Sequence, residues 1–177
     1  MTESDESLVR AFAGGDADAF LPLYRRHAPL LYGFVTRMVG LPAADDVLQE
    51  AWLRAARFLP RFEWRSSLRT WLCGIAANCA REHLRRKGRL DAEVASDGGE
   101  IATVWYDAVA DQVDLERSIA RLSPRYREVL LLHDVLEMTH AEIASALGID
   151  EGTSKSNLSR ARAAVRETLA NRRRNDE

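Results

Sequence analysis

The side chains of this chain that are best suited to chemistry are suited to binding nucleic acid, and the clearest group lies near the C-terminus. Thr139 and Glu142 have the spacing of a helix capping box. Gly148 ends the helix that follows, and Asp150 suits the start of a second helix. The outer side of that second helix carries side chains that read base edges and phosphates in the major groove. They are Lys155, Asn157, Ser159, Arg160 and Arg162. Residues 139–162 therefore predict a helix-turn-helix.

A second group, between two predicted helices, mixes aromatic, cationic and hydroxyl side chains. Its members are Arg61, Phe62, Trp64, Arg65, Ser66, Ser67, Arg69 and Trp71. Unpaired bases stack on aromatic side chains for about 1–3 kcal/mol each, and arginine attracts the phosphates. Ordinary core packing is the alternative, and it is favoured for Trp71, which falls within a helical apolar pattern; for Trp64 both interpretations stay open. The segment is a candidate site for single-stranded nucleic acid.

Two predicted helices carry strongly charged clusters, and the residues of the first cluster do not share one face. Arg81, Arg85, Arg86, Lys87 and Arg89 follow the aromatic segment and suit either a track for duplex phosphates or a solvated helix end. An earlier helix carries Asp45, Asp46, Gln49 and Glu50, with Arg54 and Arg57 one or two turns later. Taken alone, this acidic face is best interpreted as a solvated surface with stabilising charge pairs.

The composition limits the possible classes of protein. The 177 residues are 46% hydrophobic with a formal net charge of -2, which suits two small domains with modest cores. The near-neutral total hides two basic clusters, in residues 81–89 and 160–174, that suit phosphates. No signal pattern and no apolar run near the roughly 20 residues of a membrane span are visible, so we expect a cytoplasmic protein. Cys73 and Cys79 match no disulfide or zinc spacing, and neither a metal nor a cofactor is expected.

Apolar residues recur at helical intervals, which predicts an all-α fold. The expected helices of a first domain, residues 1–87, cover residues 4–13, a segment up to Pro29, and residues 30–38, 43–58 and 68–87. An acidic linker is expected over residues 88–114. A second domain, residues 115–177, would hold a helix through Leu115 and Ile119, a helix that begins at Ser123 and Pro124, and the helix-turn-helix.

With both halves in view, the chain resembles a bacterial sigma factor of the extracytoplasmic-function group, in the sigma-70 family. Residues 16–24, 45–52 and 71–78 are similar to that family's region two, and residues 122–129, 142–144, 152–156 and 160–162 to its region four. These blocks span nearly the whole chain in the family's order.

The resemblance implies a promoter-specificity subunit without catalytic residues of its own. It would bind core RNA polymerase at the β′ clamp and the β flap, and direct promoter recognition, DNA melting and transcription initiation for a specific regulon. The Asp45 to Glu50 face would dock on the β′ coiled coil, which reverses the solvated interpretation. The acidic linker would run toward the RNA exit path. An anti-sigma factor that can hold the protein at the membrane is an expected partner, and a small-molecule substrate is not.

The resemblance also assigns the DNA contacts. The segment from Arg61 to Trp71, together with Asn78, Arg85 and Arg86, would capture the non-template strand of the minus-ten element and extrude a base, which costs a few kcal/mol. Region four would read the minus-thirty-five element as duplex, with Thr153 and Ser156 added to the residues named above.

Two residues depart from the family pattern. Ser154 stands where an aliphatic residue is usual, and it would loosen the recognition helix by roughly 1 kcal/mol or more if its hydroxyl lacks a partner. Asn157 stands where a basic residue is usual and offers an amide that could pair with adenine.

Two other classes of protein fit the sequence less well. A stand-alone helix-turn-helix regulator predicts tight operator binding, commonly as a dimer, and explains neither the aromatic segment nor the acidic face. An enzyme is disfavoured because His27 and His133 lie on apolar helical faces, His83 and His140 lie near helix ends, and no phosphate-binding glycine loop is nearby.

Overall fold

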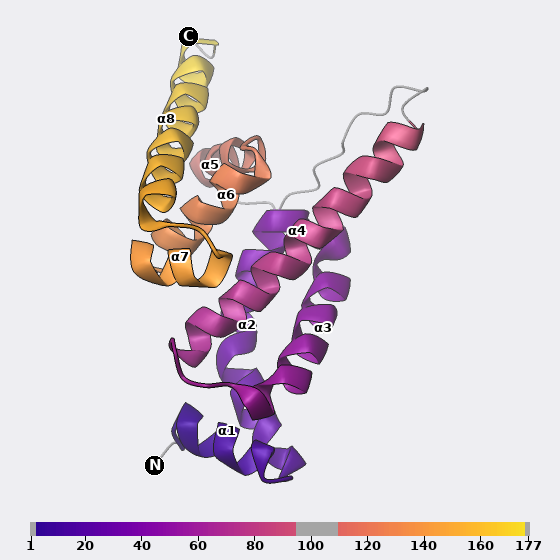
Figure 1. Cartoon of the computed structure of the whole chain (residues 1–177). Coiled ribbons are helices and arrows are strands. Elements are labelled where there is room, and N and C mark those ends of the chain that lie inside the picture. Colours follow the sequence, from indigo (N-terminus) through magenta and orange to yellow (C-terminus); the bar gives the residue numbers. More distant parts are fainter. Residues whose placement is uncertain (1–2, 95–109, 176–177) are drawn as a thin grey trace.

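The computed structural model describes residues 3–94 and 110–175, and every regular element in these ranges is helical (Figure 1). The elements are α1 (Asp5–Ala13), η1 (Ala17–Ala19), α2 (Phe20–Val39), α3 (Leu41–Phe58), η2 (Leu59–Arg61), α4 (Leu68–Val94), α5 (Ala110–Ala120), α6 (Pro124–Leu130), η3 (Leu131–Val135), α7 (His140–Leu147) and α8 (Glu151–Asn175). The predicted all-α fold is confirmed. Within these ranges no helix has the length and apolar character needed to cross a bilayer.

Helices α2, α3 and α4 pack against one another, and α1 closes one end of this first group (Figure 1). Apolar residues at helical spacing supply its core: Phe34, Val35 and Met38 of α2 are at most 1% exposed. Burial of an apolar side chain of this size contributes about 1.5–3 kcal/mol. The core therefore fixes α3 and α4, the two helices on which the charged faces lie.

Two helix boundaries differ from the sequence prediction. The prediction of two separate helices on either side of Pro29 is wrong, because α2 runs through Pro29 without a break. Proline removes one helical hydrogen bond, but the face of α2 is buried both before it, at Leu23, and after it, at Leu31. The predicted end at Lys87 is also wrong, since α4 continues to Val94 and α5 begins at Ala110, inside the expected linker. Residues 95–109 of that linker lie outside the described residues.

Helices α6, α7 and α8 form the predicted helix-turn-helix domain, with α5 packed on α8. The capping box is present. The Thr139 hydroxyl accepts a hydrogen bond from the backbone N–H of Glu142 at 3.3 Å, and a Glu142 carboxylate oxygen accepts one from the backbone N–H of Thr139 at 2.8 Å. Gly148 ends α7 in the left-handed conformation at φ 65°, where a Cβ would be strained. Asp150 accepts from the backbone N–H of Thr153 at 2.7 Å and so caps α8.

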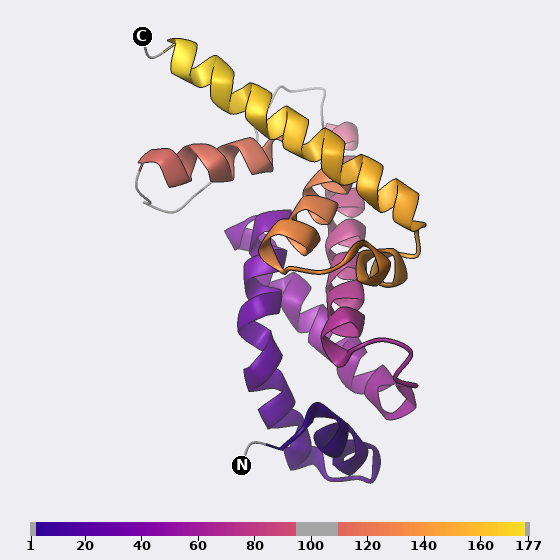
Figure 2. The ribbon, with the colours of Figure 1, turned by 90° about the vertical axis from the view of Figure 1, so that its left-hand side faces the viewer.

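The two groups of helices are in direct contact. Helix α7 packs against α4, and α5 and α6 pack against α2 (Figures 1 and 2). We call this contact the seam.

Candidate nucleic-acid and partner-binding surfaces

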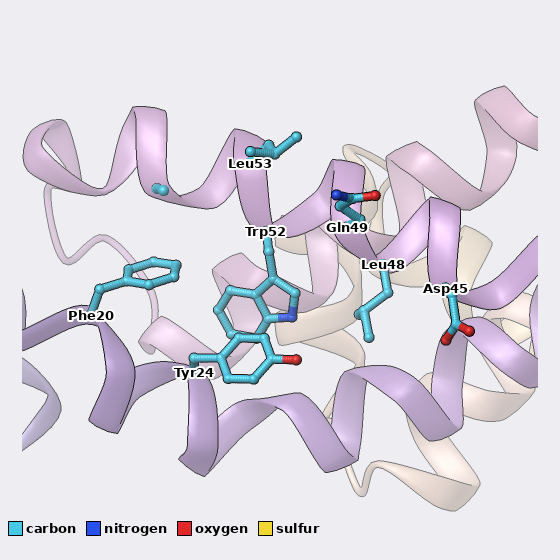
Figure 3. A pocket seen from close by; sticks show the side chains of 8 residues that line it. Phe20, Tyr24, Asp45, Leu48, Gln49, Trp52 and Leu53 are labelled. Carbon is cyan, nitrogen blue, oxygen red and sulfur yellow. The ribbon is translucent and has the colours of Figure 1, made fainter.

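A groove between α2 and α3 lies beside part of the acidic face (Figure 3). Its volume is about 320 Å³. Eight residues line it: Phe20, Tyr24, Asp45, Leu48, Gln49, Trp52, Leu53 and Ala56. The Trp52 ring lies 4.9 Å from that of Tyr24, between centroids, and 5.8 Å from that of Phe20. The groove thus joins an apolar floor to the polar groups of Asp45 and Gln49, a combination that suits a partner's apolar side chain with polar neighbours.

The four residues of the acidic face divide between two hollows. Asp45 and Gln49 border the groove, whereas Asp46 and Glu50 border a second hollow of about 310 Å³ between α3 and α4. Asp45, Asp46 and Gln49 are exposed. Glu50 instead accepts a hydrogen bond from Arg54 Nε at 2.7 Å. Among the described residues, the acidic face therefore offers three side chains without an ion pair and one, Glu50, that is partly exposed but paired with Arg54.

Arg54 joins α3 to α4. Besides its bond to Glu50, its two terminal nitrogens each donate to a carboxylate oxygen of Glu82 at 2.8 Å. The hydrogen bond from Arg54 holds the pKa of Glu82 below its ordinary value, and the bonds to Glu82 and Glu50 raise the pKa of Arg54. The network links the acidic face of α3 to α4, the helix that follows the aromatic segment.

The aromatic side chains of residues 61–71 form a stack. The Phe62 ring lies 4.8 Å from the Trp64 ring and 5.0 Å from the Trp71 ring, between centroids. Trp71 is half-buried against the core, as its helical position predicts, while Trp64 is 41% exposed. Trp64 also has a φ of 54°, which is uncommon for a bulky side chain and marks local strain. Strain of this kind concentrates at binding sites, and here it holds an indole ring out in solvent.

The polar members of this segment have different surroundings. Arg61 and Arg65 are exposed, and Arg65 pairs with Glu63 at 2.6 Å. Ser67 caps α4, because its hydroxyl accepts from the backbone N–H of Thr70 at 3.0 Å. Arg69 donates to the backbone carbonyl of Leu136, in the helix-turn-helix domain. The segment thus presents two arginines to solvent, while the third is engaged across the seam.

A further hollow of about 390 Å³ lies beside the stack. Ser66 and Trp71 line it together with Ser145 of α7. Farther along α4, Asn78, Arg85 and Arg86 are exposed. Asn78 accepts a hydrogen bond from Arg81, and Arg86 pairs with Glu82 at 3.6 Å. The residues expected to bind the minus-ten element therefore extend from the segment before α4 onto α4 itself, and Arg69 among them contacts the helix-turn-helix domain.

Helix α8 exposes most of the residues that were expected to contact duplex DNA. Lys155, Ser156, Ser159, Arg160 and Arg162 are exposed, and Thr153 is half-buried. Several are engaged within the domain: the Thr153 hydroxyl donates to Asp150 at 2.6 Å, the Ser156 hydroxyl donates to the backbone carbonyl of Thr153 at 3.0 Å, and Lys155 pairs with Glu151 at 3.6 Å. The cationic face predicted from the sequence is present.

Asn157 is the exception, and its predicted place on the exposed face is wrong. It is 1% exposed and belongs to a buried stripe with Ser154, Leu158 and Ala161. The spacing of three, four and seven residues from Ser154 puts all four on one side of a helix. Asn157 therefore does not reach a base in this structure, and its Oδ1 has no hydrogen-bond partner within the described part of the chain.

Ser154 has the partner that its buried position requires. Its hydroxyl oxygen lies 2.9 Å from Nδ1 of His140, at the start of α7, and the residue is 0% exposed. The condition for the expected loosening, a hydroxyl without a partner, is not met. Ser154 instead ties the recognition helix to the first helix of the motif.

Sequence reasoning missed several residues that shape these surfaces. Asp134 holds Arg162, and Arg127 and Glu128 lie at the seam. On the sequence they resemble the solvated charges of any helix, and only the pairing of distant segments gives them a role. Cys73 and Cys79 are buried free thiols, and burial raises the pKa of Cys73 to about 12.

Comparison with known proteins gives a consistent result. A family model for sigma-70 region 2 matches residues 23–90, and one for sigma-70 region 4 matches residues 112–165. The chain is 33% identical over 178 residues to the ECF RNA polymerase sigma factor SigW of Bacillus subtilis, with 91% of this chain and 94% of SigW covered. It is 34% identical over 168 residues to the RNA polymerase sigma factor CarQ of Myxococcus xanthus, with 91% and 95% covered.

Solved structures show the same relationship. The sigma factor RpoE of Bartonella quintana, in complex with the anti-sigma factor NepR, matches with a TM-score of 0.74 at 25% identity, over 85% of this chain and 96% of that one. CnrH, in complex with the cytosolic domain of CnrY, matches with a TM-score of 0.69 at 27% identity, over 95% and 98%. Both domains and their order are therefore shared with characterised proteins. The chain belongs to the extracytoplasmic-function sigma factors of the sigma-70 family, which direct bacterial RNA polymerase to promoters.

Proposed function

We propose that this sigma factor divides its work among three surfaces. The groove and the exposed side chains of α3 bind the β′ clamp of core polymerase. The aromatic stack around Trp64 captures the unpaired non-template strand of the minus-ten element, and the outer face of α8 binds the minus-thirty-five duplex. On this proposal residues 1–94 form the region that binds polymerase and the minus-ten element, and residues from 110 onward form the region that binds the minus-thirty-five element.

The observation that carries the proposal is the exposed Trp64 ring beside Phe62, flanked by Arg61 and Arg65. An aromatic platform with adjacent cations suits a base and its phosphate, and a lone duplex-binding regulator has no use for one. Stacking and phosphate contacts offset the few kcal/mol that unstacking a base costs. The protein supplies binding energy, and the polymerase carries out nucleotide transfer.

We further propose that an anti-sigma factor covers the groove and α3. The two solved relatives named above were each captured with such a partner or with part of one. The apolar floor at Trp52 and Tyr24, with Leu53 61% exposed at its rim, gives a second protein an anchor point. The sigma factor acts in the cytoplasm, and an anti-sigma factor with a membrane anchor would hold it at the membrane.

The test is a titration of the labelled full chain with bacterial core polymerase, followed by fluorescence anisotropy, with a housekeeping sigma factor as competitor. Asp46→Ala and Gln49→Ala should each weaken binding by roughly tenfold, or about 1.4 kcal/mol. Asp18→Ala is the matched control, because Asp18 is an exposed carboxylate of the same domain that lies outside the groove. No binding by a folded sample, or equal affinities for all three variants, would contradict the assignment of the groove and α3 to polymerase binding.

The minus-ten assignment has its own test. Trp64→Ala should lower affinity of the holoenzyme for a DNA fork with an unpaired minus-ten strand by about 10- to 100-fold, which corresponds to the loss of one stacked base. Binding to fully paired upstream DNA should not change. Equal losses on both DNAs would mean that Trp64 supports the fold and does not capture a base.

A further inference from the structure

Two histidines stack on each other where the helix-turn-helix begins. The ring of His133 in η3 lies 4.8 Å from the ring of His140 at the start of α7, between centroids. The expectation that His133 packs on an apolar helical face is wrong, because its side chain is 30% exposed. We call these two residues the histidine pair, and solvent reaches it.

The pair lies alongside the recognition helix. At one end, Nδ1 of His140 is 2.9 Å from the hydroxyl oxygen of Ser154. At the other end, Nδ1 of His133 is 2.7 Å from Oδ1 of Asp134, whose carboxylate also holds Arg162. Ser154 and Arg162 are eight positions apart in α8, so the pair runs beside about 12 Å of that helix. A DNA strand that contacts the cationic face of α8 passes next to the pair.

The charged groups around the pair come from three segments. They are Asp134 of η3, Glu137 of the turn that follows, and Glu151, Lys155 and Arg162 of α8. Both cations are already paired, Lys155 with Glu151 and Arg162 with Asp134. A phosphate at this point therefore needs a positive charge that the pair itself supplies.

The other elements packed on the pair hold their charges elsewhere. In α7, Glu142 accepts from the backbone of Thr139 within the capping box. Helices α2 and α6 also contact η3, but Arg37, Arg127 and Glu128 of these helices bond to groups at the seam. The carboxylates and cations of the preceding paragraph thus set the electrostatics of the pair.

The hydrogen bond to Asp134 determines where His133 carries its proton. Burial would raise the pKa of Asp134, but the bonds from Arg162 and His133 hold it below its ordinary value, so the carboxylate is ionised at neutral pH. An ionised carboxylate only accepts, so Nδ1 of His133 is the donor. A neutral imidazole has a single N–H, which leaves Nε2 of His133 without a hydrogen. Within the described residues, Nε2 of neither ring has a hydrogen-bond partner.

His140 is not restricted in this way. The hydroxyl of Ser154 can donate as well as accept, so Nδ1 of a neutral His140 accepts from it while Nε2 carries the hydrogen. Burial lowers the pKa of His140, and the neighbouring His133 lowers it further. His140 is therefore neutral near pH 7 and already has an N–H to donate, whereas His133 has to gain one.

We propose that the histidine pair is a binding site for a backbone phosphate of duplex DNA, and that binding there adds one proton from solvent to Nε2 of His133. Phosphate oxygens only accept hydrogen bonds, so Nε2 can bond to one only as N–H. The N–H at Nδ1 stays on Asp134, and the resulting imidazolium forms a charge-assisted hydrogen bond with the phosphate. This inference rests on the proposed function, because it takes α8 as the face that DNA approaches.

Proton uptake makes DNA binding depend on pH. Histidine changes its charge between pH 5 and 8, and binding that takes up one proton strengthens by up to about tenfold for each unit by which the pH falls. Affinity for duplex DNA should therefore be roughly tenfold higher at pH 6 than at pH 8. Phosphate contacts carry no sequence information, so the effect does not require the promoter sequence.

The test is an anisotropy titration of the full chain with a mixed-sequence 20-base-pair duplex, at constant low ionic strength and with a dye that does not respond to pH. Wild type should lose roughly tenfold in affinity from pH 6 to pH 8. His133→Gln cannot titrate and should show the same affinity at both. His83→Gln is the matched control, because His83 lies on α4 beside α3, and it should keep the wild-type dependence.

A second variant tests the mechanism while His133 is still present. In Asp134→Asn the new amide can donate to Nδ1 of His133, so a neutral His133 can carry its hydrogen on Nε2. This variant should also lose the pH dependence. Calorimetry in buffers of different ionisation enthalpy counts the protons directly, with about one taken up by wild type and none by either variant.

The outcomes separate this inference from the proposed function. Wild type that binds duplex DNA equally well at pH 6 and pH 8 would overturn the proton-loading site and leave the proposed function intact. A pH dependence that persists in His133→Gln would assign the proton to another group and overturn it as well. Wild type that binds no duplex DNA at either pH, even at low salt, would instead count against the proposed role of α8.

Discussion

Asp134, just before the helix-turn-helix, accepts two hydrogen bonds from Arg162 of the recognition helix. Arg162 Nε donates to Oδ2 at 3.0 Å, and a terminal nitrogen of Arg162 donates to Oδ1 at 2.6 Å. Burial alone would raise the pKa of Asp134, but the bonds from Arg162 and His133 hold it below its ordinary value. The carboxylate thus stays charged at neutral pH and neutralises one of the cations expected at the DNA.

Releasing this cation should change the salt dependence of DNA binding. Asp134→Asn keeps the shape of the side chain but removes its charge, so that Arg162 can neutralise a phosphate. The slope of log K against log salt for a minus-thirty-five duplex should become steeper by about 0.9. Arg162→Ala is the control and should leave the slope unchanged, because Asp134 already neutralises this cation in wild type. A shallower slope in Asp134→Asn would show instead that Asp134 positions Arg162 for DNA.

The hydrogen bond between Ser154 and His140 should be visible in stability. Ser154→Ala leaves Nδ1 of His140 without its partner, and the loss of a buried hydrogen bond costs roughly 1 kcal/mol. Urea unfolding of the full chain should show this decrease. Ser156→Ala is a fair control, because Ser156 is exposed on the same helix. A Ser154→Ala variant as stable as wild type would mean that the bond adds nothing.

Asn157 allows a prediction that runs against the sequence-based expectation. Its Oδ1 is buried without a hydrogen-bond partner in the described residues, so Asn157→Leu, which has a similar volume, should raise the free energy of unfolding by about 1 kcal/mol. Promoter preference should not change, since the side chain does not face outward. Lys155→Ala provides the contrast, with weaker DNA binding at unchanged stability. An altered base preference in Asn157→Leu would show instead that Asn157 contacts a base.

These residues show what the sequence could and could not predict. The caps at Thr139, Gly148 and Asp150 depend on neighbours within a few positions, and each was predictable from local spacing. Asn157 also lies at helical spacing from the buried residues Leu158 and Ala161, so its burial could have been predicted from the sequence. Its polar amide made an exposed position look more plausible.

The seam was not predictable in this way. Arg37 Nε donates to Glu116 at 3.0 Å although the two residues are 79 positions apart, and each resembles an ordinary solvated charge. A Cβ atom added to Gly74 would lie 2.8 Å from the backbone carbonyl oxygen of Ala146. Gly74 has no turn or cap to explain it in the sequence, because its role depends on this carbonyl in a different domain. Contacts between domains carry no local periodicity, so they become visible only in three dimensions.

Glu128 at the seam should make stability depend on pH. It is 3% exposed, and Arg81 Nε of α4 lies 3.4 Å from its Oε1. Burial raises the pKa of Glu128 from 4.5 to about 7, although Arg81 opposes the shift. Because the folded state holds this proton more tightly than the unfolded state, the free energy of unfolding should fall as pH rises from about 4.5 to 7. A difference of this size corresponds to about 3 kcal/mol.

Glu128→Gln removes the titration and keeps the shape, so the difference in stability between the variant and wild type isolates this one group. That difference should be small at pH 5 and should grow in favour of Glu128→Gln by pH 8, in urea unfolding of the full chain. His83 and His140 do not obscure the difference, because burial lowers the pKa of both in the variant and in wild type alike. A difference that stays constant between pH 5 and 8 would mean that Glu128 titrates near its ordinary pKa and that Arg81 compensates fully for its burial.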